Sequence, residues 1–494
     1  MLLQNILTGF LNVLNFNVFL TINFGLVLGI IFGALPGLTA TMGVALFMPL
    51  TFGMDPILGI TMLLGIYCGG IYGGSVTANL IKTPGTPASA ATILDGYPLV
   101  QQGHAGKALD MSLVASVIAG LISALILLLV APQLARIALR FGPPEYFALA
   151  MFGLTIIASV ASKNIFKGII MGALGMYISM IGLDEVGGMP RLTFGHPYLA
   201  GGIKLIPALI GLFAISEILN KVRAGQYKIK QSTEFTNENV TWSELKGSLK
   251  TIVKSSGIGT FIGAIPGTGA AIASFLSYNE AIRASKTPEK FGTGHLEGVA
   301  ASEAGNNGVT GATLIPLLTL GIPGDTVTAV LLGALLMQGL QPGPALFRDY
   351  APIVYTIMVA LIFVNLFMLL QGKLFVRAFA NVTKIPVNLL LPILLVLCVT
   401  GAFAENNTMF DVWMMFIFGI IGYVLIRNDF PVTPLLLARI LGPLAEVSMR
   451  QSLIMSGGSY SIFFTRPICL FFIIVALLSI VFAIFKKTPE MTEY

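Results

Sequence analysis

Apolar segments long enough to cross a bilayer follow one another along most of the chain. Residues 111–131, 350–370 and 466–485 each reach the roughly 20 apolar residues that a spanning helix needs. Alternation of apolar and polar residues, which is typical of spanning strands, does not mark these segments. The pattern predicts an all-α polytopic membrane protein with about ten to twelve crossings or half-crossings.

Composition supports this class and argues against a soluble globule. The 494 residues are 55% hydrophobic and 10% charged, whereas a soluble domain has about 25% charged residues. Cysteines and histidines are few and scattered, without the spacing of metal ligands or of a catalytic triad, so we expect neither a transition-metal site nor an enzyme. These residues are Cys68, Cys398, Cys469, His104, His196 and His295.

Two proline-glycine motifs occur twice along the chain. Residues 33–37 read GALPG and residues 263–267 read GAIPG; residues 82–87 read KTPGTP and residues 321–326 read GIPGDT. Proline and glycine at paired positions inside membrane-length segments predict interrupted helices, and such pairs mark binding sites in transporters. We therefore expect two homologous repeats with broken helices or re-entrant hairpins at these motifs.

Charge suggests the orientation of the chain. Lysines and arginines are concentrated in one polar segment and recur in the tail, so the positive-inside rule places both in the cytoplasm. Membrane topology explains these residues better than nucleic-acid binding does. The expected organisation is an N-terminal helix (1–22), a first membrane repeat (23–220), a cytoplasmic basic linker (221–254), a second membrane repeat (255–485) and a cytoplasmic tail (486–494).

Matched loops of the two repeats carry opposite charge. Residues 161–167 form a basic loop, whereas the matching residues 404–411 carry acidic side chains and no basic one. One matched pair, at residues 136–140 and 377–384, is basic in both repeats and argues the other way. On balance the charge pattern favours inverted repeats.

Broken helices offer binding chemistry at membrane depth. Each helix start exposes N–H groups and a partial positive charge, which suit a carboxylate, and freed carbonyls suit a cation. Glycine and threonine also serve close helix packing, which for any single residue is an equally good interpretation. The substrate-binding candidates are Pro36, Gly37, Thr39, Thr83, Gly85, Thr86, Ser89, Gly267, Thr268, Gly269, Gly324, Thr326 and Thr328.

Candidate ligands for a coupling ion are Asn79, Asn306, Asn307 and Asp325, and Na⁺ is a candidate ion there. Asp325 follows a Pro-Gly pair directly, so it caps the next helix, serves coupling as a cation ligand or proton carrier, or does both. Glu303, just ahead of the two asparagines, is a weaker candidate of the same kind.

The motifs resemble those of a known family. Residues 33–37, 72–87, 263–267 and 321–325, together with GLQPGP at residues 339–344, look like the large membrane subunit (TctA type) of the tripartite tricarboxylate transporters. The resemblance covers nearly the whole chain. It implies a subunit that imports small organic carboxylates such as citrate across the bacterial inner membrane, driven by a Na⁺ or H⁺ gradient and without a cofactor.

The resemblance also implies partners. Family members work with a small four-helix membrane subunit (TctB type) and a periplasmic solute-binding protein (TctC type). The chain lacks a Walker-type loop for ATP, in agreement with secondary transport. More distant transporter relatives suggest an elevator-like motion. A stand-alone carboxylate:cation symporter is the nearest alternative, and a channel or an intramembrane enzyme is a more distant one.

Overall fold

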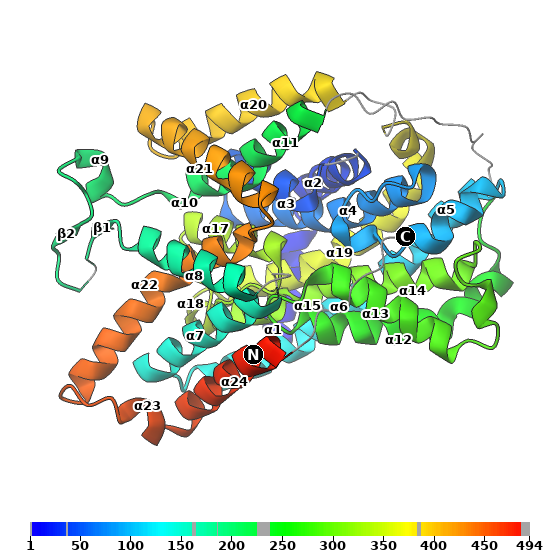
Figure 1. The fold of residues 1–494 in the computed structure, drawn as a ribbon. Coiled ribbons are helices and arrows are strands. Elements are labelled where there is room, and N and C mark those ends of the chain that lie inside the picture. Colours follow the sequence, from blue (N-terminus) through cyan, green and yellow to red (C-terminus); the bar gives the residue numbers. More distant parts are fainter. Residues whose placement is uncertain are drawn as a thin grey trace.

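Helices make up nearly all of the structure, a computed structural model that describes residues 2–35, 38–160, 165–184, 186–224, 238–382 and 387–485 (Figure 1). A single short hairpin in these ranges pairs β1 (Gly182–Leu183) with β2 (Pro190–Arg191) in antiparallel fashion. Seven of the described helices are long and apolar enough to span a membrane, and several shorter apolar helices accompany them. The predicted all-α membrane class is confirmed.

The described residues of the first half of the chain form eleven α-helices, two 3-10 helices and one π-helix besides the hairpin. They are α1 (Leu2–Val13), α2 (Phe16–Ala34), α3 (Ala40–Phe47), η1 (Met48–Thr51), α4 (Pro56–Ile81), η2 (Pro87–Ser89), α5 (Ile93–Gln101), α6 (Ala105–Ala138), α7 (Pro143–Val160), α8 (Ile165–Ser179), α9 (Pro197–Ala200), α10 (Leu205–Leu209), the π-helical η3 (Ile210–Ile215) and α11 (Ser216–Ala224).

Helices are the only regular elements among the described residues of the second half. They are α12 (Trp242–Gly263), α13 (Gly269–Ala284), η4 (Pro288–Lys290), α14 (Leu296–Asn307), α15 (Val309–Ala312), α16 (Leu314–Leu320), α17 (Thr326–Met337), α18 (Pro344–Asp349), α19 (Ala351–Val382), α20 (Val387–Ala404), α21 (Met409–Arg427), α22 (Val432–Met455), α23 (Ile462–Thr465) and α24 (Pro467–Phe485).

Each proline-glycine motif separates two helices. In the first half the motifs fall between α2 and α3 and between α4 and η2; in the second half they fall between α12 and α13 and between α16 and α17. The chain therefore interrupts its helices at the four places that the sequence predicts. The inverted duplication itself stays a prediction.

Two boundaries within the expected segments have local causes. Helix α12 begins at Trp242, inside the stretch expected as a linker, because Thr241 and Glu244 form a reciprocal capping box. Near the N-terminus, α1 and α2 are separate helices, and the side chain of Asn15 caps the second by accepting from the amide of Asn17.

Helices α2 and α4 pack with their backbones almost in contact. Glycines recur at every fourth position of α2 from residue 25 to 33 and of α4 from residue 65 to 73. A β-carbon on Gly29 would lie 2.4 Å from the carbonyl oxygen of Ile66. Small residues at this spacing allow such close approach between membrane helices. This tight pair supports the first two interruptions.

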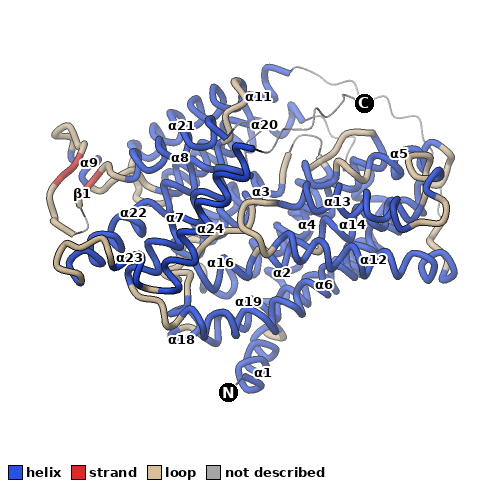
Figure 2. The backbone as a smooth tube through the Cα atoms, turned by 60° about the horizontal axis from the view of Figure 1, so that its bottom comes forward, coloured by secondary structure: helices blue, strands red, loops and turns tan. Residues whose placement is uncertain are grey.

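Helices α7, α8, α22 and α24 pack on one another as one group, whereas α12, α13, α14 and α6 pack together as another. The hairpin projects at one end of the molecule, and α5 and the start of α12 lie at the opposite end, as both views show (Figures 1 and 2). The molecule therefore has two distinct ends.

Candidate substrate pocket

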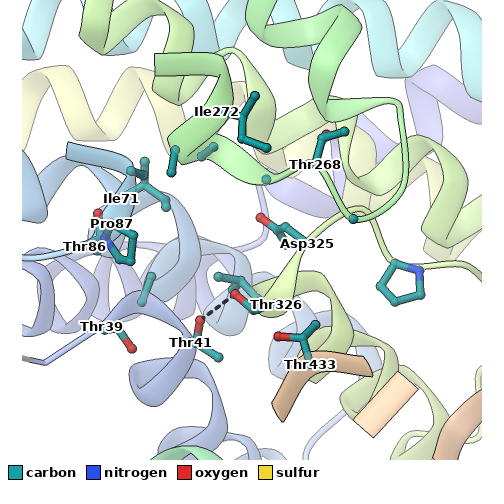
Figure 3. A pocket seen from close by; sticks show the side chains of 18 of the residues that line it. Thr39, Thr41, Ile71, Thr86, Pro87, Thr268, Ile272, Asp325, Thr326 and Thr433 are labelled. Carbon is teal, nitrogen blue, oxygen red and sulfur yellow. Dashed lines mark hydrogen bonds between the residues drawn. The ribbon is translucent and has the colours of Figure 1, made fainter. Parts of the chain in front are cut away.

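One pocket of about 360 Å³ receives residues from the motifs of both halves (Figure 3). The segment that opens α3 and the segment that opens η2 contribute residues from the first half, and the starts of α13 and α17 contribute those from the second. The lining residues are Thr39, Ala40, Thr41, Ile71, Thr86, Pro87, Ala88, Gly267, Thr268, Gly269, Ala270, Ala271, Ile272, Pro323, Asp325, Thr326, Val327, Thr433 and Leu437.

Two of the helix starts at the pocket are capped by their own side chains. The Thr39 hydroxyl accepts a 3.1 Å hydrogen bond from the amide of Met42 at the start of α3. Asp325 caps α17, since its Oδ1 accepts a 2.7 Å hydrogen bond from the amide of Thr328. These side chains satisfy backbone donors that would otherwise face the pocket.

Helix α13 is different, because no side chain caps it. The hydroxyl of Thr268 points backwards and donates to the carbonyls of Ile262 (2.6 Å) and Ile265 (2.9 Å). The first turn of α13, at residues 269–271, lines the pocket. Its N–H groups and the positive end of its dipole are therefore available to an anion.

The carboxylate of Asp325 is held by groups from both halves of the chain. Its Oδ2 accepts a 3.0 Å hydrogen bond from the phenol of Tyr67, and its Oδ1 accepts a 2.7 Å hydrogen bond from the hydroxyl of Thr328. The residue is 9% exposed. Asp325 therefore fixes the start of α17 and still borders the pocket.

Direct contacts hold the interruptions together. The amide of Gly267 donates a 2.8 Å hydrogen bond to the carbonyl of Gly324, so the two motifs of the second half touch. Between the halves, the hydroxyls of Thr41 and Thr326 lie 3.2 Å apart (Figure 3). Gly267 has a φ of +83°, a conformation in which glycine is favoured.

Seven of the candidate residues expected from the motifs line the pocket, and eight others in the described part of the chain do not. Those that line it are Thr39, Thr86, Gly267, Thr268, Gly269, Asp325 and Thr326. Those that do not line it are Thr83, Gly85, Ser89, Gly324, Thr328, Asn79, Asn306 and Asn307, while Pro36 and Gly37 lie outside the described residues.

Two expected ion ligands lie in buried polar contacts behind the pocket. Asn307 Nδ2 donates a 2.8 Å hydrogen bond to Ser116, and Asn79 Nδ2 donates a 2.9 Å hydrogen bond to Ser112. Asn306 is also fully buried. The four candidate ion ligands thus divide between the pocket, where Asp325 lies, and the helices behind it.

One wall of the pocket comes from residues outside the proline-glycine motifs. Thr433 and Leu437 come from α22, which packs against α7 and α8 and carries neither proline-glycine motif. Because Thr433 and Leu437 are four residues apart, they lie on the same face of the helix. No spacing or motif in the sequence distinguishes this helix from the other apolar segments.

Comparison with known proteins assigns the chain to a family. The family model described as "Tripartite tricarboxylate transporter TctA family" matches residues 19–437. The chain belongs to this family. A TctA-family protein is a membrane component of a transporter and not an enzyme.

Two relatives from Agrobacterium vitis resemble this TctA-family chain. An uncharacterized 52.8 kDa protein in the TAR-I ttuC' 3' region is 35% identical over 460 residues, which cover 93% of this chain and 92% of the relative. An uncharacterized protein in the TAR-II ttuC' 3' region is 36% identical over 226 residues, covering 46% of this chain and 93% of that protein. No solved structure matches the chain.

Proposed function

We propose that this chain is the permease subunit of a binding-protein-dependent system that imports small organic carboxylates, citrate or a related di- or monocarboxylate. The observation that carries the proposal is the uncapped start of α13 at a pocket that both halves of the chain line. A substrate carboxylate there accepts hydrogen bonds from backbone N–H groups and meets the positive end of the helix dipole.

The rest of the pocket suits a small polar substrate. Its volume of about 360 Å³ is at the lower end of the range for ligand pockets, about 300–1,000 Å³. The hydroxyl oxygen of Thr86 is buried and has no hydrogen-bond partner, so a second polar group of the substrate can satisfy it. Ile71 and Ile272 provide apolar contact around these polar points.

Family membership and the lack of a Walker-type loop in the sequence support an ion gradient as the energy source. A gradient of Na⁺ or H⁺ drives uptake, and the candidate ion ligands are Asp325 at the pocket and the asparagines behind it. The partners are the small four-helix membrane subunit and the periplasmic solute-binding protein. In this scheme the binding protein delivers the carboxylate to the pocket.

Basic residues at one end of the molecule support an orientation in the membrane. Lys246, Lys250 and Lys254 lie in α12, whose start is at the end opposite the hairpin (Figure 1). By the positive-inside rule that end is cytoplasmic, together with the basic linker and the tail. The hairpin then faces the periplasm of a bacterial inner membrane, the side from which a binding protein approaches.

The pocket lies where two groups of helices meet. In an elevator-like transporter, one such group moves past the other and exposes the substrate alternately to the two sides of the membrane. The interrupted segments supply most of the lining, whereas Thr433 and Leu437 come from the group of α7, α8 and α22. Movement of the broken helices, as inverted repeats, past α22 would carry the substrate across.

Uptake of labelled citrate into proteoliposomes tests the proposal. The vesicles contain this chain with its small subunit, and uptake is measured with and without the binding protein under imposed Na⁺ or H⁺ gradients. We expect gradient-driven uptake that requires the binding protein. Gradient-driven uptake without that protein would favour a stand-alone symporter, and uptake that ignores both gradients would contradict secondary transport.

A further inference from the structure

Glu303 in α14 is a buried carboxylate without a cationic partner among the described residues. It is 0% exposed, and its Oε2 accepts hydrogen bonds from the hydroxyls of Ser75 (2.6 Å) and Ser116 (3.1 Å). Its Oε1 accepts one from the hydroxyl of Thr92. None of the ion pairs in the described part of the chain includes Glu303. An enclosed charge of this kind is costly without a positive partner.

Asn306 provides a second and independent observation. It is 0% exposed, and neither its Nδ2 nor its Oδ1 has a hydrogen-bond partner. Asn306 follows Glu303 by three residues and Ser302 by four, so the three side chains share one side of α14. Thr92 contacts that side, since its hydroxyl reaches both Ser302 (3.2 Å) and Glu303. An amide that is buried and unpaired beside an uncompensated carboxylate indicates a missing ligand.

We propose that Glu303, the amide oxygen of Asn306 and the hydroxyls around them bind Na⁺, and that this is the coupling-ion site. Carboxylate, amide and hydroxyl oxygens are ligands for hard cations. A single carboxylate among neutral oxygens matches one positive charge. A proton would neutralise Glu303 without engaging the amide oxygen of Asn306, whereas a metal ion between the two side chains balances the charge and coordinates that oxygen.

A short chain of hydrogen bonds connects this site with the substrate pocket. The amide of Thr92 donates to the carbonyl of Ser89 (3.2 Å), and the hydroxyl of Ser89 donates to the carbonyl of Thr86 (2.9 Å). Thr86 lines the pocket. An ion that holds Thr92 therefore holds the segment that positions Thr86. Because linkage is reciprocal, bound substrate then raises the affinity for Na⁺. This coupling role rests on the proposed function, whereas ion binding itself does not.

Thermal unfolding of the full chain with its small subunit, without substrate, tests the ion site. NaCl is titrated against choline chloride at constant ionic strength. We expect a saturable rise in Tm with Na⁺ and none with choline, and we expect Glu303→Gln and Asn306→Leu to abolish the rise. Glu297→Gln, on the same helix, is the matched control, and we expect it to retain the rise in Tm with Na⁺. A wild-type protein that does not respond to Na⁺, or a Glu303→Gln variant that responds like the wild type, would overturn the proposal.

A milder variant covers the case in which Glu303→Gln does not fold. Thr92→Val removes one hydroxyl from the site, and we expect a higher half-saturating Na⁺ concentration; an unchanged value would count against the site. Citrate uptake separates the two proposals. Na⁺ stabilisation without any gradient-driven uptake leaves the ion site standing and contradicts the transport function. Uptake by Glu303→Gln with wild-type Na⁺ dependence contradicts the coupling role.

Discussion

The phenol of Tyr67 donates a 3.0 Å hydrogen bond to Oδ2 of Asp325 and so joins α4 to the start of α17. The same phenol lies 3.1 Å from the hydroxyl of Thr313, and all three side chains are buried. Residues from opposite halves of the chain thereby fix one helix start at the pocket. The geometry of the site depends on packing between the halves as well as on the motifs themselves.

Tyr67→Phe should destabilise the protein by about 1–3 kcal/mol, because it leaves a buried carboxylate with one donor fewer. The measurement is the free energy of unfolding in detergent. Tyr177→Phe, at a tyrosine that is 53% exposed, is the control and should change little. Equal stability of the Tyr67 variant and the wild type would show that the bond to Asp325 contributes nothing.

Thr433→Val should weaken carboxylate binding, because the pocket loses the hydroxyl contributed by α22. Loss of one neutral hydrogen bond, about 0.5–1.5 kcal/mol, corresponds to roughly a twofold to tenfold rise in the apparent Kd. Equilibrium binding of labelled citrate measures the effect. Thr400→Val, on α20 and away from the pocket, should bind like the wild type; a Thr433 variant that does so too would place the substrate elsewhere.

Gly29→Ala should destabilise the α2–α4 pair, since the added methyl group meets the Ile66 carbonyl at 2.4 Å. Overpacking of this kind costs about 1–3 kcal/mol. The comparison is Gly172→Ala in α8, where a β-carbon meets nothing within 4 Å, and which should be neutral or stabilising. Thermal unfolding of both variants checks the prediction, which fails if the two behave alike.

The ion pair between Lys107 and Glu244, at the start of α12, should be sensitive to acid. The hydrogen bond from Lys107 lowers the pKa of Glu244 from its ordinary value of 4.5 to about 2. Because the pKa of Glu244 is lower in the folded state, its ionisation stabilises the folded protein at pH values above the pKa of the unfolded state. This stabilisation is lost as the pH falls from 4.5 to about 2.

Hydrogen exchange in the first turn of α12, followed against pH, measures this effect. Glu244→Gln should flatten the profile in that acidic window. Lys107→Met should flatten it only in part, because the hydrogen bonds from Thr241 continue to lower the pKa of Glu244. A profile for Glu244→Gln that still falls like that of the wild type would assign the acid sensitivity to another group.

The helical class and the positions of the interruptions could be predicted because both depend on local sequence. A run of apolar residues must be helical in a membrane, and a Pro-Gly pair cannot continue a regular helix. The start of α12 at Trp242 was harder to predict, because its capping box lies in a polar segment whose composition is typical of a linker. The spacing of apolar residues does not indicate which distant helices pack together, such as α22 with α7 and α8.

The part of the pocket formed by residues next to helix starts could be predicted in the same way. Thr39, Thr86 and Asp325 directly precede helix starts, so the motifs predict that these residues lie close to free backbone N–H groups. Asn79 and Asn307 lie in helices that are apolar or buried on all sides, where sequence does not reveal which face a side chain takes. Both face other helices instead of the pocket.

Protection of the pocket by substrate shows whether the carboxylate binds between the broken helices. Ala271→Cys is introduced into a chain whose three native cysteines, all buried, are replaced by alanine, and a charged thiol reagent is applied with and without citrate. Ser285→Cys, beyond the far end of α13, is the control. We predict that citrate slows modification at residue 271 and leaves residue 285 unaffected. Equal rates at residue 271 with and without citrate, in protein that still takes up citrate, would show that the carboxylate does not bind between the broken helices.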